Sequence, residues 1–203
     1  MAEPPAAAPG GVATAGQDVL LATKLHVPTR RPGFVPRPRL AARLEQGLAR
    51  GLLLVCAPAG SGKTVLLADW ARRSGRPVAW LSLDAGDSDP ARFWRHVVAA
   101  LDRIRPGLAD RVGSLLGPPS PRSFEGVVAA VINELAADPG ADEVLLVLDD
   151  YHLVSAGPVD DSVAFLLENR PSRHRRGGAG RRSGGSRRGP AAPRPRRAGQ
   201  PGR

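Results

Sequence analysis

A run of eight small and polar residues is the part of the sequence best suited to chemistry. Its members are Ala57, Pro58, Ala59, Gly60, Ser61, Gly62, Lys63 and Thr64. They fit the phosphate-loop pattern G-x-x-x-x-G-K-[ST], with Ala57 in place of the first glycine. Small residues let successive backbone N–H groups turn toward an anion, and a helix beginning near Gly62 adds its positive N-terminus. The pattern predicts that Lys63 reaches the β- and γ-phosphates of a nucleotide and that the Thr64 hydroxyl binds Mg²⁺.

A second candidate element is the acidic pair Asp149-Asp150, which directly follows the apolar run 144–148. Ligands of open α/β sheets bind at the carboxyl ends of the strands, so these carboxylates are well placed for a nucleotide site. We expect Asp149 to hold Mg²⁺ through water. For Asp150 two roles stay open: it polarises an attacking water, or it caps the following turn.

Other chemically capable side chains have simpler structural explanations. Asp84, Asp87 and Asp89 follow a predicted strand and could approach the nucleotide, but a capped helix start explains them equally well. Cys56 is expected to be a small core residue, because it ends an apolar run. The remaining candidates are expected to serve packing or turns; they are His96, His152, Trp70, Trp80 and Trp94.

Three apolar runs that alternate with helical patterns must position these residues. The runs 52–56, 77–83 and 144–148 have the length of strands buried on both faces. Helices are predicted from Leu40 to Leu48, from the phosphate loop to before Gly75, from an Asp89 cap to Pro106, over 124–135 and over 158–169. The stretch 18–38 is rich in proline, so we expect an extended loop there. This alternation predicts an α/β fold of the P-loop NTPase type, a parallel sheet with helices on both faces.

Charge divides the chain into three parts. The chain has 203 residues, 29 basic against 19 acidic, but 11 of the 29 are arginines of the segment 171–203. Residues 18–170 therefore read as one domain, preceded by an Ala/Pro/Gly-rich leader, 1–17, and followed by an Arg/Gly/Pro-rich tail; both are predicted to be disordered. A single cysteine excludes an intrachain disulfide framework, and no apolar run is long enough to span a bilayer. A cytoplasmic protein with no membrane contact is expected.

Four stretches resemble, in order and spacing, the ATPase module of large LuxR-type transcriptional regulators, which are signal-transduction ATPases with numerous domains. They are LATKLHVPTRRPGFVPRPRL, VCAPAGSGKTVLLADW, VAWLSLDAGDSDPARFWRHVVAAL and LLVLDDYHLV. The resemblance implies a switch between ADP-bound and ATP-bound forms with Mg²⁺, and self-association driven by an inducer. It also implies DNA binding through a helix-turn-helix domain that this sequence lacks. By the same resemblance Arg39, in the loop 36–39, is a candidate adenine contact.

The sequence departs from the resemblance at about residue 171. There the family continues with another buried strand ending in Ser-Arg, which lies between the phosphate-loop strand and the strand ending in the acidic pair. Here an Arg-rich tail follows, which suggests a shift of reading frame near 171–176, testable by translating the other two frames. Without that strand the sheet is truncated, with a gap between 52–56 and 144–148.

Three functions follow for comparison. The leading one is a nucleotide-binding switch module; ATP hydrolysis is implied by the resemblance, but efficient turnover by this chain is not expected. The second is a small P-loop kinase, which phosphate transfer compared with Lys63→Ala would identify. The third is nucleic-acid binding by the 11 arginines of the tail, which tail deletion would abolish.

Overall fold

A computed structural model describes residues 20–30, 32–117, 123–137, 143–155 and 157–170. The chain divides into two compact units, Met1–Pro171 and Ser172–Arg203, and every described residue lies in the first. The predicted leader 1–17 and the tail 171–203 lie outside the described residues.

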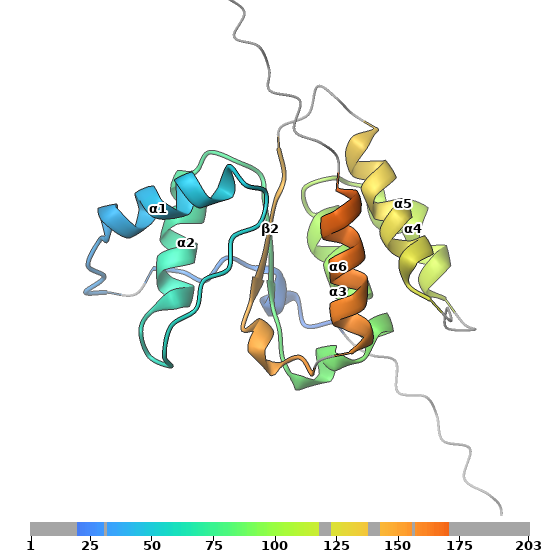
Figure 1. Ribbon diagram of the computed structural model, residues 1–203, viewed down its shortest axis with the longest axis horizontal. Helices are drawn as coiled ribbons and strands as arrows, with labels where there is room; N and C mark the ends of the chain where they lie inside the picture. The colour runs from blue at the N-terminus through green and yellow to red at the C-terminus, as the bar shows by residue number, and fades with distance from the viewer. Residues whose placement is uncertain (1–19, 31, 118–122, 138–142, 156, 171–203) are drawn as a thin grey trace, which may run out of the picture. The chain divides into compact units, whose positions relative to one another are not determined.

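Two parallel strands form the sheet of the described chain (Figure 1). Strand β1 (Val78–Ser82) pairs with β2 (Leu145–Asp149) in a register that sets Val78 opposite Leu145 and Ser82 opposite Asp149. Both carboxyl ends therefore lie at the same edge of the sheet, and Asp149 is at that edge. The two predicted strands that contain these residues are confirmed.

Helices cover both faces of this sheet (Figure 1). One face packs against α3 (Pro90–Asp102), α4 (Leu108–Gly113), α5 (Glu125–Ala136) and α6 (Pro158–Asn169). The other packs against α1 (Pro38–Leu48) and α2 (Lys63–Arg73). Alternate residues of β1 serve the two cores, with Ala79 and Leu81 in the first and Trp80 in the second, as the period of a strand requires. The α/β class with helices on both faces is confirmed.

The three tryptophans that were expected to serve packing lie in these cores. Trp94 belongs to the first core, where its Nε1 donates to Ser162 Oγ of α6 at 2.9 Å. Trp70 and Trp80 belong to the second. All three are buried.

The apolar run 52–56 is not a strand, which corrects the sequence-based prediction. Leu54 is 77% exposed and Leu52 55% exposed, whereas Leu53 and Val55 pack against the second core. Cys56 is exposed too, so its predicted place in a core is wrong. The run thus has one covered side and one open side. The reason is that an apolar segment becomes a strand only when a neighbour takes its backbone hydrogen bonds, and in the described chain β2 pairs with β1 alone.

The start of α3 follows the predicted capping signal. Asp89 accepts a hydrogen bond from the Arg92 N–H at 2.7 Å, and Pro90 takes the first position of α3. Pro38 takes the first position of α1, so this helix begins earlier than the predicted Leu40 and includes the last residue of the stretch 18–38 that was predicted to be extended. The stretch also contains a single 3₁₀ turn, Ala22–Leu25.

Short helical pieces account for the rest of the described structure. Helix α4 was not predicted, because six residues after Gly107 are too few to show a periodic pattern. Three further 3₁₀ turns are Ala85–Ser88, Ser114–Leu116 and Tyr151–Leu153.

Candidate nucleotide-binding site

The phosphate loop connects the run 52–56 to the N-terminus of α2. Gly60 and Gly62 both adopt the left-handed backbone conformation, with φ of 75° and 84°. Residues with a Cβ rarely adopt it, which explains the glycines at these positions of the motif. Gly62 is also the N-cap of α2 and gives it no side-chain cap. The first N–H groups of the helix are therefore not used by a capping side chain and are suited to an anion.

Ser61 supplies a further polar group in the loop. Its Oγ is buried and has no hydrogen-bond partner among the described residues. A buried hydroxyl without a partner is uncommon, and a phosphate oxygen is one group that would satisfy it. The loop thus fits a phosphate by backbone conformation and by its polar groups.

Lys63 closes back over the loop that precedes it. Its Nζ donates to the carbonyl oxygens of Ala57 at 2.8 Å and Pro58 at 3.3 Å, and the contact is exposed. An ammonium group has three donors and little preferred direction, so it can move from these neutral acceptors to an anionic phosphate. The structure places the predicted phosphate-binding lysine at the mouth of the loop.

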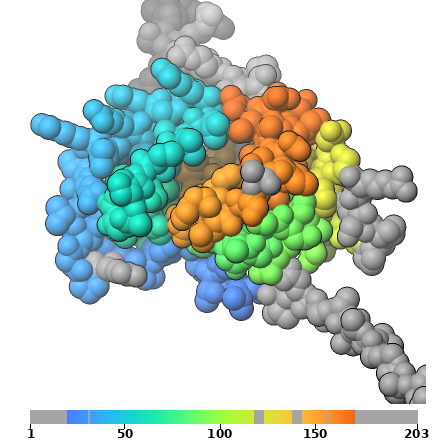
Figure 2. All heavy atoms as spheres, turned by 60° about the horizontal axis from the view of Figure 1, so that its bottom comes forward, coloured from blue at the N-terminus to red at the C-terminus, as the bar shows by residue number. Residues whose placement is uncertain are grey.

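The Thr64 hydroxyl and the Asp149 carboxylate meet across 85 residues of sequence. Thr64 Oγ1 donates to Asp149 Oδ1 at 3.0 Å, joining the first turn of α2 to the carboxyl end of β2. Figure 2 shows a hollow here, between the loop and α2 (cyan to teal) and the residues that follow β2 (orange). The two side chains predicted to hold Mg²⁺ are therefore neighbours. Hydroxyl and carboxylate oxygens are ligands that Mg²⁺ prefers.

Burial sets the electrostatics of Asp149. It raises the pKa of the carboxyl above its ordinary value, and the nearby charge of Asp150 acts in the same direction. The hydrogen bond from Thr64 and the charge of Lys63 oppose that rise. A buried carboxylate of this kind gains from a cation, because a cation offsets the lost hydration of its charged form.

Asp150 is the N-cap residue of the 3₁₀ turn Tyr151–Leu153, but its side chain makes no capping hydrogen bond there, so the structure does not bear out the capping role. Its φ of 58° makes it the one described residue other than glycine in the left-handed conformation. The turn is held by Tyr151, whose hydroxyl donates to Asp160 Oδ1 of α6 at 2.6 Å. Burial and that carboxylate raise the pKa of Tyr151, so the phenol stays a donor. His152 Nδ1 lies 3.9 Å from Asp150 Oδ1. Water activation by Asp150 stays a prediction.

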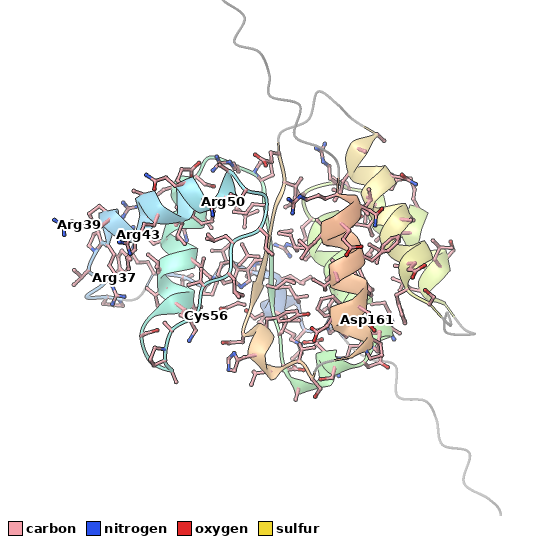
Figure 3. The ribbon with its side chains drawn as sticks, in the orientation of Figure 1. Arg37, Arg39, Arg43, Arg50, Cys56 and Asp161 are labelled. Carbon is pink, nitrogen blue, oxygen red and sulfur yellow. The ribbon has the colours of Figure 1, made fainter. Side chains whose placement is uncertain are left out.

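The loop before α1 reaches the phosphate loop through Arg37, not through Arg39. Arg37 Nη1 donates to the Ser61 carbonyl at 3.0 Å. Arg39 is exposed and points away from the phosphate loop (Figure 3), and its adenine contact stays a prediction. Sequence reasoning identified Arg39 as the contact and missed the bond from Arg37 to the phosphate loop. The only signal for Arg37 was its place in the motif Pro36-Arg37-Pro38-Arg39.

The three aspartates after β1 have structural partners. Asp84 accepts from the Gly86 N–H at 2.9 Å, and Asp89 caps α3. Asp87 is fully buried and accepts from Lys24 Nζ at 2.6 Å, and His96 Nδ1 lies 2.7 Å from its other oxygen. Burial lowers the pKa of His96 despite the carboxylate beside it. The capping explanation is confirmed, and no pattern in the sequence indicated the buried Lys24–Asp87 pair.

Within the described ranges, no group of three or more His, Cys, Asp or Glu side chains is gathered as a metal site. No helix of the described residues combines the length and apolarity needed to cross a membrane.

Comparison with known proteins identifies the fold family. Residues 47–176 match the family described as an AAA domain. The chain is 33% identical over 163 residues to the serine/threonine-protein kinase PknK of Mycobacterium tuberculosis (strain ATCC 25618 / H37Rv), which covers 79% of this chain and 14% of PknK. It is also 33% identical over 153 residues to the HTH-type transcriptional regulator MalT of Cronobacter sakazakii, covering 75% of this chain and 17% of MalT. The MalT of Yersinia enterocolitica is 32% identical over the same length.

These relatives are much longer proteins, and the matched segment is about one sixth of each or less. The family match, in contrast, covers well over half of this chain and includes the phosphate loop, β1 and β2. The chain belongs to the AAA domain family of P-loop proteins.

Proposed function

We propose that this chain is an ATP- and ADP-binding switch module of a LuxR- or MalT-like transcriptional regulator. The observation that carries the proposal is the bond between Thr64 and Asp149, which joins the phosphate loop to the carboxyl end of β2. Two oxygen ligands on different elements, beside a loop with left-handed glycines, form a site for Mg²⁺ and a polyphosphate.

Each part of the site has a distinct task in this proposal. The loop 57–62 and the N-terminus of α2 bind phosphate oxygens through backbone N–H groups, and Lys63 neutralises phosphate charge. Thr64 and Asp149 hold Mg²⁺, which screens the remaining negative charge of the bound nucleotide. Burial raises the pKa of the Asp149 carboxyl, and a cation bound beside it would favour its charged form.

The relatives support a switch rather than a self-contained activity. One is named a transcriptional regulator and another a protein kinase, yet both contain a segment similar to this chain. A segment shared by proteins with different named activities is best explained as a module that controls other domains. Inducer-driven self-association and DNA binding belong to the longer proteins in this proposal.

Calorimetric titration of the full chain with Mg-ATP and Mg-ADP tests the proposal. Lys63→Ala is expected to weaken binding by about 100-fold, because it removes a cation from two phosphates. Thr64→Ala should reduce the dependence of binding on Mg²⁺. Arg43→Ala is a matched control, since Arg43 is exposed on α1 (Figure 3) and its loss removes one positive charge outside the loop.

Two results would contradict the switch proposal. Equal binding by the wild type and Lys63→Ala would remove the phosphate loop from the function. Rapid transfer of the γ-phosphate to a small molecule, lost in Lys63→Ala, would support the P-loop kinase instead.

A further inference from the structure

Arg37 contacts the phosphate loop from a segment 24 residues earlier in the chain. Its Nη1 donates to the carbonyl oxygen of Ser61 at 3.0 Å. Its guanidinium also lies against Gly62, because a Cβ built on that glycine would meet Nη2 at 3.8 Å and Nη1 at 3.9 Å. The guanidinium therefore faces the junction between the loop and α2.

Rigid surroundings fix the backbone of Arg37. It lies between Pro36 and Pro38, and each proline restricts its own φ and the residue before it. It is also the N-cap residue of α1, whose Leu44 and Leu48 are buried in the second core. The arginine is thus presented to the loop by a packed helix rather than by a free chain end.

The geometry of a peptide unit links this contact to anion binding. The Ser61 carbonyl and the Gly62 N–H belong to one peptide plane, and in a trans peptide they point in opposite directions. When Arg37 holds the carbonyl on its own side, the Gly62 N–H is aimed at the opposite side. Gly62 has the left-handed backbone conformation, and glycine has little intrinsic preference between positive and negative φ. An external contact can therefore decide how this peptide is oriented.

We propose that Arg37 is a positioning residue that fixes the Ser61–Gly62 peptide and thereby strengthens binding of the polyphosphate part of a nucleotide, whatever the base. This inference rests on the proposed function and goes beyond it, since Arg37 lies outside the phosphate-loop motif. It also assigns a role distinct from a contact with adenine. A loop-positioning arginine must affect every ligand that the loop binds, whereas an adenine contact affects only ligands that carry the base.

The test compares two ligands and two arginines in the full chain. Mg-ATP and Mg-tripolyphosphate are titrated into the wild type, Arg37→Gln and Arg39→Gln. Arg39 is the matched control, because it belongs to the same Pro-Arg-Pro-Arg motif but points away from the loop (Figure 3). Arg37→Gln is expected to weaken both ligands by the same factor, about three- to tenfold, a modest loss because the contact is exposed. Arg39→Gln should leave both affinities within about twofold of the wild type.

The outcomes separate this inference from the proposed function. If the wild type binds Mg-ATP and Arg37→Gln loses affinity for ATP alone, Arg37 contacts the nucleoside and the inference is overturned. Unchanged affinities in Arg37→Gln, or equal losses in the two arginine variants, overturn it as well. Failure of the wild type to bind Mg-ATP would instead contradict the proposed function. Thermal unfolding without ligand checks that Arg37→Gln folds; if it does not, Arg37→Lys replaces it, with the same expected equality between the ligands.

Discussion

Two apolar runs of equal length lead into the two halves of the site, and only one of them is a strand. The run VLLVL, 144–148, supplies most of β2, which pairs with β1 along its length and ends in the buried Asp149. The run LLLVC, 52–56, has the same kind of residues, but the second core covers only one of its sides. Composition therefore does not distinguish them. The difference is a hydrogen-bonded neighbour, which β2 has and 52–56 lacks in the described chain.

The site is supported unequally as a result. Asp149 is held by the sheet, whereas the phosphate loop arrives from an unpaired segment. What positions the loop is the helix after it, because Leu66 and Trp70 of α2 are buried in the second core. The bond from Thr64 to Asp149 then joins that helix to the sheet. A phosphate loop can thus be placed by its helix even where the preceding strand is absent.

The largest predicted effect is a contrast in stability between two leucines. Leu145 is 8% exposed in β2, and Leu54 is 77% exposed in the unpaired run. We expect Leu145→Ala to lower the free energy of unfolding by about 2–4 kcal/mol, the usual cost of truncating a core leucine. Leu54→Ala should change it by less than about 0.5 kcal/mol. Urea unfolding followed by circular dichroism measures both.

Hydrogen exchange sharpens the same contrast without a mutation. Amides of 145–149 should exchange far more slowly than those of 52–56, because only the former belong to a paired strand. Strong protection of both runs, or similar losses from the two leucine substitutions, would mean that 52–56 is a strand in solution.

The sequence predicted elements well where local chemistry decides them. The Asp89 cap with Pro90 and the buried strand within 77–83 depend on neighbouring residues, and both have the expected structure. The pair of Thr64 and Asp149 was predictable because two motifs with known relative placement specify it.

Contacts between distant segments were not predictable in this way. Arg37 with Ser61 and Lys24 with Asp87 join segments that come together only after folding, and neither pair has a spacing that marks it. The prediction of a strand over 52–56 was wrong for a related reason. Whether an apolar run forms a strand depends on a pairing partner, which the periodicity of the run itself does not reveal.

A smaller effect concerns pH and the buried network on the β1 side. Because burial lowers the pKa of His96 below 6.5, the unfolded chain takes up a proton on acidification before the folded chain does. The free energy of unfolding should therefore fall as the pH drops below about 6.5, by up to about 1.4 kcal/mol per pH unit, until the folded pKa is reached. The groups that face His96 are Asp87, with Lys24 and Arg92 nearby.

Unfolding measured between pH 7.5 and 5 checks this prediction in the wild type and in His96→Gln. The substitution should flatten the part of the slope due to His96. The exposed His152 provides the control substitution, His152→Gln. An unchanged slope in His96→Gln would show that the network does not resist protonation.

The smallest predicted effect is at Cys56, on the open side of the unpaired run. Cys56→Ser should alter the free energy of unfolding by less than about 0.5 kcal/mol, since the thiol is exposed. The folded protein should also react with a thiol reagent at the rate of a small-molecule thiol. If the substitution lowers the free energy of unfolding by more than about 1 kcal/mol, or if the thiol reacts only after unfolding, Cys56 lies in a core. The run 52–56 would then be buried on both sides, as β2 is.

The end of α6 gives the unpaired run a particular engineering value. Arg170 Nη2 donates to the Arg50 carbonyl at 3.0 Å, and its guanidinium lies against Gly51, so the last described residue sits beside the start of 52–56. A segment fused directly after Arg170 would therefore meet the run at high effective concentration, in the millimolar range that short tethers give. Apolar peptides of varied sequence attached there could be ranked by the gain in melting temperature alone. The chain would then report parallel strand addition within a single polypeptide.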